Sequence, residues 1–350
     1  MDSHWLHHLL SVYLSFTIAI LESILLALSN IKRFPFFVTL ANTILSLYYR
    51  FNCNLSPCTV DLDDQTTMHY WTASHRRFDK PNLILIHGYG STSLWQFVRQ
   101  VGTLSRSFNL YVPDLLFFGK SHTKQSDRTD VFQARCVSEG LKRLGVERYS
   151  VYAISYGGWV GYRMAEMHPK VVEKVVIVSS GLGFVGEERE KHLRKIEVNI
   201  MDLLCPQKSD DLRSLVSLTM HKYNLAKWIP DFFLREYISV TSKNFRKERL
   251  ELAEYLLAKT TDNDLPTLTQ ETLLIWGDKD NVFPLFLAHR LQSHLGPKSK
   301  LEIIKDTGHA VNFDSPDVLN DLIKSFVLSS PKLEVETCVQ AQKRCLTVDF

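Results

Sequence analysis

Ser155 is the strongest candidate nucleophile in this sequence. Residues 149–154 read Y-S-V-Y-A-I, which is typical of a buried strand, and the pattern turns helical after Gly157 and Gly158. A serine hydroxyl is a weak nucleophile, so it needs a sharp strand-to-helix turn that exposes its oxygen and aims it at a base. The motif is small-x-Ser-x-Gly, with Ala153 where the usual pattern has glycine. We therefore interpret Ser155 as the tip of a nucleophile elbow.

Asp280 is the predicted acid of a catalytic triad. In one common arrangement the triad residues follow in the chain order Ser, Asp or Glu, His. Asp280 ends the acidic turn W-G-D-K-D, which follows a short apolar strand that begins at Glu271. Asp278 is the alternative, although its position directly after Gly277 suits a residue that shapes the turn. The strand predicted over residues 172–179 ends without a carboxylate, which favours the later site.

His309 is the predicted base. A strand predicted over residues 300–305 runs into D-T-G-H-A, so His309 lies just past a strand end. The chain has 13 histidines, and most histidines are surface or packing residues. The position of His309 after Asp280 in the chain, and next to Gly308, distinguishes it from the others. Because the ring must be neutral to accept a proton, we expect activity to rise with pH as the histidine deprotonates.

An oxyanion hole is predicted from a second glycine turn. Residues 82–90 read N-L-I-L-I-H-G-Y-G, in which a buried strand meets a turn of the HG-x-G type. Such a turn supplies a backbone N–H that stabilises an oxyanion. We interpret His87 as structural and the N–H of Tyr89 as one donor. The N–H of Tyr156, directly after the nucleophile, is the second.

Together the motifs H-G-Y-G, A-I-S-Y-G-G, W-G-D-K-D and G-H-A resemble those of the α/β-hydrolase superfamily, over about residues 60–328. In detail the chain is similar to plant members of the branch that contains monoacylglycerol-lipase-like enzymes and C–C bond (meta-cleavage product) hydrolases. The resemblance implies an α/β fold: an eight-stranded, mostly parallel sheet with helices on both faces and an inserted helical cap. It also implies that Asp114, in V-P-D-L after the fourth strand, is structural.

The serine at the elbow has a further implication. Related epoxide hydrolases and haloalkane dehalogenases carry aspartate there, so Ser155 implies acyl transfer through serine. The expected function is a serine hydrolase that cleaves an apolar carboxylic ester, for example a lipid ester. Two alternatives stay open: a C–C bond hydrolase that uses the same triad, and a slow-turnover receptor for a hormone-like ligand. The apolar N-terminus argues against the receptor, because those receptors are soluble proteins.

Five segments are predicted along the chain. Residues 1–52 form a hydrophobic, membrane-associated segment, residues 53–185 and 267–330 form the two parts of the hydrolase core, and residues 331–350 form a flexible tail after a last helix over residues 316–328. Residues 186–266 lack strand signals and are rich in helical periodicity, with an amphipathic stretch over residues 187–204. We expect this cap to pack its aromatic residues on the core, with a few lining an apolar pocket.

Residues 9–28 are an apolar run about as long as the ~20 residues that span a bilayer. Glu22 is its only charged residue, and Lys32 with Arg33 follow it. The positive-inside rule then favours a catalytic domain on the cytoplasmic side, for example at the endoplasmic reticulum, with a cytoplasmic protein as the alternative. Because residues 34–51 are also apolar and a glutamate within a span is costly, a helical hairpin on the membrane surface or packed on the protein is a further alternative.

Composition excludes several other classes of protein. The 350 residues are 45% hydrophobic with a net charge of +3, and no basic patch or phosphate-binding glycine loop indicates nucleic acid or a nucleotide. The six cysteines have neither C-x-x-C spacing nor metal-type spacing with histidines, so we expect free thiols, no metal and no cofactor. Cys53 with Cys58, and Cys338 with Cys345, could pair only in an oxidising compartment. The expected partner is a small apolar ester; the sequence does not determine the oligomeric state.

Overall fold

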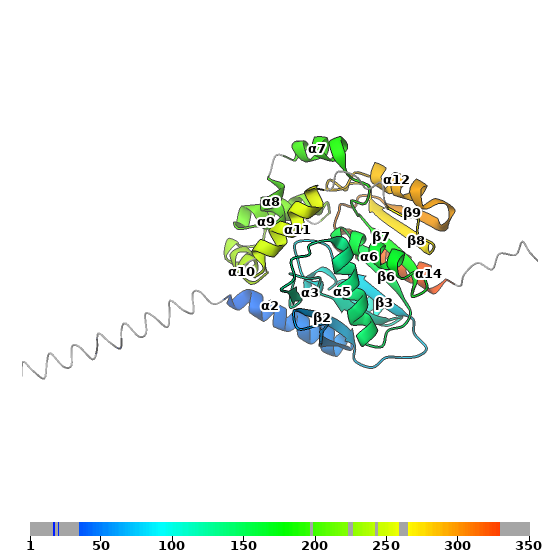
Figure 1. Cartoon of the computed structure of the whole chain (residues 1–350). Helices are drawn as coiled ribbons and strands as arrows, with labels where there is room; N and C mark the ends of the chain where they lie inside the picture. The colour runs from blue at the N-terminus through cyan, green and yellow to red at the C-terminus, as the bar shows by residue number, and fades with distance from the viewer. Residues whose placement is uncertain are drawn as a thin grey trace, which may run out of the picture.

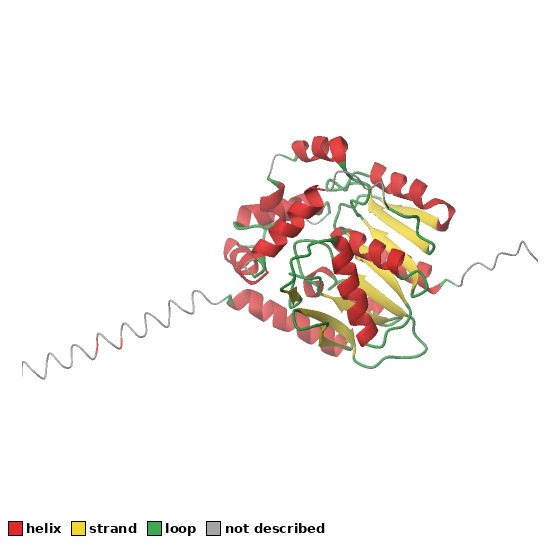
Figure 2. Cartoon of the chain, viewed as in Figure 1, coloured by secondary structure: helices red, strands yellow, loops and turns green. Residues whose placement is uncertain are grey.

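The structure, a computed structural model, describes residues 17, 20, 35–196, 199–222, 227–241, 244–258 and 265–329. Its centre is one twisted sheet with helices on both faces (Figure 1, Figure 2). The sheet order is β1-β2-β4-β3-β6-β7-β8-β9, with β5 paired to β2. The strands are β1 (Leu55–Asp61), β2 (Thr66–Ala73), β3 (Asn82–Ile86), β4 (Asn109–Pro113), β5 (His122–Thr123), β6 (Tyr149–Ile154), β7 (Val172–Val178), β8 (Glu271–Gly277) and β9 (Ser299–Ile304).

The sheet is mostly parallel, as predicted. From β4 through β3, β6, β7 and β8 to β9 every pair of neighbours is parallel, whereas β2 is antiparallel to β1, β4 and β5. The predicted α/β fold is confirmed, with the two-residue β5 as a ninth strand beyond the expected eight. The central strands β3 and β6 are buried along their whole length, because helices cover both faces of a parallel sheet.

Two apolar clusters lie on the two faces of the sheet. Along β6, Val151 and Ala153 join the cluster that contains α5 and α6, and Tyr152 and Ile154 join the cluster that contains α4 and α14. This alternation follows from the two-residue period of a strand. The helices of the core are α3 (Ser93–Gln96), α4 (Val101–Leu104), α5 (Asp130–Arg143), α6 (Tyr156–Met167), α12 (Phe286–Leu295), α13 (Val311–Asp314) and α14 (Pro316–Leu328), with a 3-10 turn at Gly296–Lys298.

Within the described residues, the cap inserted between β7 and β8 contains five α-helices. They are α7 (Gly186–Lys195), α8 (Ile200–Leu204), α9 (Ser209–Thr219), α10 (Asp231–Thr241) and α11 (Arg246–Ala258). Figure 1 shows α8 to α11 gathered on one side of the core, away from α14. The amphipathic stretch expected over residues 187–204 forms two helices, because the backbone is extended at Ile196 and a new helix begins after Asn199, whose side chain accepts a hydrogen bond from the Met201 amide.

The N-terminal part of the described chain is α2 (Phe36–Leu47), which continues into a π-helical turn, η1 (Tyr48–Asn52). Within the described ranges, the helices are too short or too polar to cross a bilayer. The predicted apolar run 9–28, apart from Thr17 and Ile20, and the predicted tail 331–350 lie outside these ranges.

The four described cysteines are free thiols: Cys53, Cys58, Cys136 and Cys205. Cys53 and Cys58 are therefore not joined, and Cys338 and Cys345 lie outside the described residues. The same part of the chain holds no group of histidine, cysteine and carboxylate side chains arranged to bind a metal ion.

Candidate active site

Ser155 lies at a sharp turn between β6 and α6. Its backbone has φ 55° and ψ −124°, a conformation that costs free energy in a residue with a side chain. The turn is held on both sides, since the Ser155 amide donates to the carbonyl of Val178 at 2.9 Å and the Gly158 amide donates to the carbonyl of Ser155 at 2.9 Å. The arrangement matches the predicted elbow and presents the Ser155 side chain to a cavity.

Glycines allow α6 to approach the sheet closely enough for this turn. A Cβ at Gly157 would lie 2.5 Å from the carbonyl oxygens of Ile86 and His87, so a side chain there would clash with backbone. A Cβ at Gly161 would lie 2.8 Å from the Cβ of Ala153. The methyl group of Ala153, the departure from G-x-S-x-G, is therefore accommodated by the missing side chain at Gly161.

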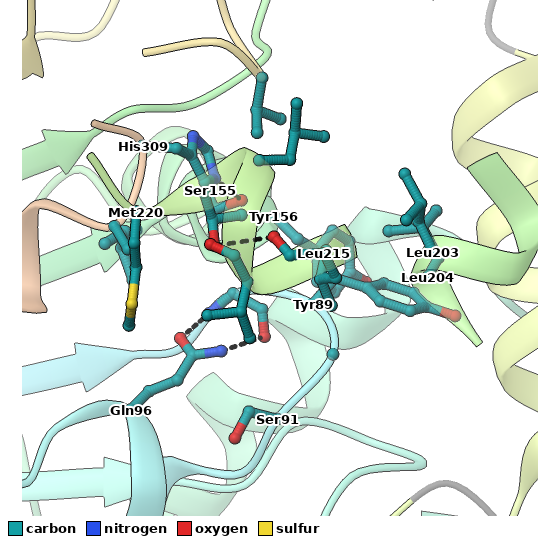
Figure 3. A pocket seen from close by; sticks show the side chains of 18 of the residues that line it. Tyr89, Ser91, Gln96, Ser155, Tyr156, Leu203, Leu204, Leu215, Met220 and His309 are labelled. Atoms are coloured by element: carbon teal, nitrogen blue, oxygen red, sulfur yellow. Dashed lines mark hydrogen bonds between the residues drawn. The ribbon is translucent and has the colours of Figure 1, made fainter. Parts of the chain in front are cut away.

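The three predicted triad residues meet. The Nε2 atom of His309 lies 2.9 Å from Ser155 Oγ, and Figure 3 shows these two side chains next to each other. The Nδ1 atom of His309 lies 3.0 Å from Asp280 Oδ2 and 3.2 Å from Oδ1. The Asp280 side chain is 0% exposed and also accepts hydrogen bonds from the amides of Val282 and Phe283, at 2.9 and 2.8 Å. These amides fix the carboxylate so that it can orient the ring.

The alternative acid, Asp278, points elsewhere. One of its carboxylate oxygens accepts a hydrogen bond from the Thr307 amide at 3.2 Å, and its side chain is 26% exposed. Asp278 therefore ties the turn after β8 to the loop before His309. This is the turn-shaping role that the sequence suggested for it.

The turn 87–90 lies directly against the elbow. A Cβ at Gly88 would be 2.9 Å from the Cβ of Ser155. The amide of Tyr89 follows Gly88, and the amide of Tyr156 is the first of α6, where no acceptor exists within the helix. Within the described residues neither amide donates a hydrogen bond. Both predicted oxyanion donors are thus near the nucleophile and available to a ligand.

The His87 side chain supports this turn through two hydrogen bonds. Its Nδ1 lies 2.7 Å from the carbonyl of Gly88, and its Nε2 accepts a hydrogen bond from the Leu115 amide at 2.9 Å. Burial lowers the pKa of His87, although the charge of Asp114 and the bond to Gly88 oppose this effect. A neutral ring with its proton on Nδ1 satisfies both bonds. His87 has the structural position expected for it.

Asp114 is the centre of a buried polar network. Its carboxylate accepts hydrogen bonds from Ser93 Oγ at 2.6 Å, the Ser93 amide at 3.1 Å and the Lys120 amide at 3.2 Å, and it lies 2.9 Å from Nδ1 of His69. Burial alone would raise the pKa of Asp114, but the hydrogen bonds and charge of His69 and the other partners outweigh burial and lower it. Asp114 joins β2, β4 and α3 behind the site rather than within it.

Three further residues build the site without having been singled out in the sequence. The side chain of Gln96 binds the backbone of Gly88, and Asn312 Nδ2 donates to the Gln96 carbonyl at 2.7 Å. The ring of Phe283 packs edge-on against the His309 ring, with 5.3 Å between ring centroids. The only local signal was that Asn312 follows the G-H-A motif and Phe283 follows the acidic turn; no spacing pointed to Gln96.

A cavity of about 400 Å³ opens above Ser155, within the range typical of small-molecule sites. Its lining comes from both the core and the cap, and Figure 3 shows Leu203, Leu204, Leu215 and Met220 drawn around the Ser155 and His309 side chains. The hydroxyl of Tyr89 donates to the carbonyl of Arg249 in α11 at 2.6 Å, which ties the turn 87–90 to the cap. The polar side chains of the lining include Ser91, Gln96, Thr219 and Asn312.

Comparison with known proteins finds relatives that are named as hydrolases. The chain is 26% identical over 270 residues to a pimeloyl-[acyl-carrier protein] methyl ester esterase of Vibrio vulnificus, covering 75% of this chain and 98% of the relative. It is 24% identical over 256 residues to a 2-hydroxy-6-oxononadienedioate/2-hydroxy-6-oxononatrienedioate hydrolase of a Pseudomonas species, covering 70% of this chain and 87% of the relative.

A solved structure of a membrane phospholipase A shares the fold with a TM-score of 0.70 at 21% identity, covering 89% of this chain and 97% of that one. The sequence model of the alpha/beta hydrolase family matches residues 83–322, which include the elbow, the acid and the histidine. Since this match spans most of the chain and the sheet has the expected order, the protein belongs to the alpha/beta hydrolase family.

Proposed function

We propose that this protein is a serine hydrolase that cleaves an apolar carboxylic ester, with Ser155 as nucleophile, His309 as base and Asp280 as acid. The observation that carries the proposal is the hydrogen-bonded chain from Ser155 Oγ through the His309 ring to the buried Asp280 carboxylate, at the floor of an apolar cavity. A nucleophile within hydrogen-bond reach of a base that a third group orients is what an activated serine requires.

In the proposed reaction, Ser155 Oγ attacks the ester carbonyl carbon while His309 Nε2 accepts the hydroxyl proton. Asp280 accepts the hydrogen bond from Nδ1 and stabilises the imidazolium that forms. The amides of Tyr89 and Tyr156 donate to the oxyanion of the tetrahedral intermediate. The intermediate collapses as His309 gives its proton to the leaving alcohol, and water then repeats both steps on the acyl-enzyme to release the acid and restore Ser155.

The charge of the lining supports an uncharged acyl group. Among the described residues that line the cavity, Arg189 alone carries a permanent charge, and its guanidinium donates to the carbonyls of Leu256 and Leu257. A buried, unpaired anion would be costly here. An apolar acyl chain, as in a lipid ester, suits the remaining side chains.

A C–C bond hydrolase is the second candidate, because the Pseudomonas relative is named as a hydrolase of oxodienedioates. A dioate carries two carboxylates, and the described lining offers Arg189 as its one permanent cation. The apolar lining therefore favours the ester. A slow-turnover receptor would bind its ligand in the same cavity and would differ from an esterase only in the rate of hydrolysis.

A direct test is labelling with a fluorophosphonate, paired with hydrolysis of p-nitrophenyl esters of increasing chain length. We expect wild type to be labelled and to prefer a medium or long acyl chain, and Ser155→Ala to lose both properties. Ser91→Ala, a serine variant in the same cavity, is the matched control and should keep both. Labelling without turnover of any ester would favour the C–C hydrolase or the receptor; no labelling of wild type would contradict the proposed nucleophile.

A further inference from the structure

Helix α2 is amphipathic with its apolar side turned outward. Its exposed apolar side chains, extended by one from η1, have exposed fractions from 46% to 77% and are Phe36, Phe37, Leu40, Ile44, Leu47 and Phe51. From Phe37 to Phe51 the spacing is three or four residues, which places these side chains along one face, with Phe36 beside its first residue. A helix on the surface of a globular protein normally turns such a face towards the core. A continuous exposed apolar face of this kind indicates a binding surface.

Specific contacts hold α2 in this orientation. On its inner side, Asn42 Oδ1 accepts a hydrogen bond from Trp95 Nε1 at 2.7 Å, and Val38 is completely buried. The Val38 amide, in the first turn of α2, donates to the Glu236 carboxylate of α10 at 3.0 Å. Polar groups on the inner side therefore bind the core and cap, which leaves the apolar side exposed.

The apolar face continues onto the cap. The rings of Phe37 and Phe232 lie 4.9 Å apart, and Phe232 and Trp228 are 46% and 84% exposed. Figure 1 shows α2 next to α10 at the same edge of the molecule. We call this surface the α2–α10 patch; its residues are Phe36, Phe37, Leu40, Ile44, Leu47, Phe51, Trp228 and Phe232.

The charges of the chain segment that contains α2 indicate what the patch binds. On the neighbouring α10, Glu236 is bonded to the Val38 amide and Asp231 is paired with Arg213 and Arg235. The sequence has no acidic residue between Glu22 and Asp61, whereas Lys32, Arg33 and Arg50 lie in that stretch. The same stretch follows the apolar run 9–28 in the chain. An apolar stripe flanked by cations binds the interface of an anionic bilayer, since the apolar side chains enter the acyl boundary and the cations meet the headgroups. A dimer formed through this patch would instead bring the cations of the two copies close to one another.

We propose that the α2–α10 patch is a docking surface for an anionic lipid bilayer. This contact is separate from the predicted insertion of residues 9–28 and does not rest on the proposed esterase function. It has a consequence for the cavity, because Ile229 and Phe233 line the cavity while their neighbours Trp228 and Phe232 belong to the patch. Docking would lay this wall of the cavity along the bilayer.

The test uses the full chain and vesicles of phosphatidylcholine with phosphatidylglycerol. The double variant Leu40→Glu with Ile44→Glu places charges on the patch, and Val318→Glu with Leu328→Glu is the matched control. The control residues are also exposed, at 50% and 49%, but lie on α14, away from α2 in Figure 1. We expect the patch variant to need at least about tenfold more lipid for half-maximal flotation and the control to match wild type. Circular dichroism should show that both variants are folded.

A second measurement separates the patch from anchoring by residues 9–28. Brominated phosphatidylcholine quenches tryptophans at the bilayer interface, and the difference between wild type and Trp228→Phe isolates the signal of Trp228. At equal amounts of vesicle-bound protein, we expect Trp228 to be quenched in wild type and in the α14 control but not in the patch variant.

Three results would overturn the proposal. Unquenched Trp228 in vesicle-bound wild type would mean that residues 9–28 bind the vesicle alone, and equal quenching in the patch variant would mean that α2 has no part in docking. A wild type that sediments as a dimer without lipid, with a monomeric patch variant, would assign the patch to a second copy of the chain.

Discussion

The side chain of Gln96 holds the backbone of Gly88 through two hydrogen bonds. The Gly88 amide donates to Oε1 at 2.8 Å, and Nε2 donates to the Gly88 carbonyl at 3.2 Å. In this clamp, the bond to the Gly88 carbonyl fixes the peptide unit that carries the Tyr89 N–H, a proposed oxyanion donor, and the bond from the Gly88 amide fixes the peptide before it. The clamp also connects the turn to the histidine loop, since the carbonyl of Gln96 accepts from Asn312.

The variant Gln96→Leu should lower kcat about tenfold to a hundredfold, because a small displacement of a group that binds the transition state is costly. KM should change much less, because the apolar acyl contacts remain. Steady-state kinetics with a p-nitrophenyl ester separates the two constants, and thermal unfolding checks the fold. A stable Gln96→Leu enzyme with unchanged kcat would show that the clamp does not position the oxyanion hole.

Asp280 and Asp278 offer a matched pair of carboxylates in one turn. Asp280→Asn should lower kcat by about 10³ to 10⁴, because an amide cannot orient and stabilise the His309 ring as a carboxylate does. Asp278→Asn should stay within a few-fold of wild type, since Asp278 binds the Thr307 amide instead. The kcat values of both variants, measured at one pH, decide the assignment; a larger loss for Asp278→Asn would reverse it.

The contact between α6 and β6 predicts that one substitution can compensate for the loss of stability caused by another. Gly161→Ala should destabilise the protein by roughly 1–3 kcal/mol, because the new methyl would meet the Cβ of Ala153 at 2.8 Å. Adding Ala153→Gly should recover part of this loss, although Val151 at 3.1 Å limits the recovery. Urea unfolding of the two single variants and the double variant gives the coupling free energy. Additive effects would mean that the two positions do not share this space.

The sequence predicted those parts of the fold that local pattern determines. Apolar runs predicted strands at residues 172–179 and 300–305, and the structure has them at Val172–Val178 and Ser299–Ile304. The last core helix was predicted over residues 316–328 and spans Pro316–Leu328. The short β5 forms by pairing with β2, a contact distant in sequence, so periodicity alone could not reveal it. The break between α7 and α8 follows from the extended backbone at Ile196 and the new start at Asn199, which the helical period of residues 187–204 does not show.

The candidate site also has residues that the local sequence predicts and residues that it does not. Ser155, Asp280 and His309 each sit beside a strand end with glycine or acidic turn residues, a signal present in the local sequence. Gln96 is an ordinary helical residue whose partner lies on another segment. For residues 34–51 the sequence left two positions open, on the membrane surface or packed on the protein, because only packing shows which side of α2 faces the core.

Stability should depend on pH through His87. Burial lowers the pKa of His87 in the folded protein, whereas a histidine in an unfolded chain titrates near about 6.5. Its contribution to stability is therefore complete above about pH 6.5 and is lost as the pH falls towards the lowered folded value.

We expect His87→Gln, which keeps a side-chain acceptor near the Leu115 amide, to flatten the fall in unfolding free energy between about pH 7 and pH 5. The difference in slope should be up to ~1.4 kcal/mol per pH unit. Denaturant titrations across this range measure it. Equal slopes for wild type and variant would mean that His87 does not carry this pH dependence.

In the proposed reaction Ser155 forms an acyl-enzyme. The most direct measurement is rapid-quench mass spectrometry of wild type during turnover of a p-nitrophenyl ester, with peptide mapping of the adduct. We expect a burst of p-nitrophenol and a mass increase equal to the acyl group on the peptide that contains Ser155, with neither in Ser155→Ala. Turnover that persists in Ser155→Ala, or an adduct on another residue, would contradict the assignment of Ser155 as the nucleophile.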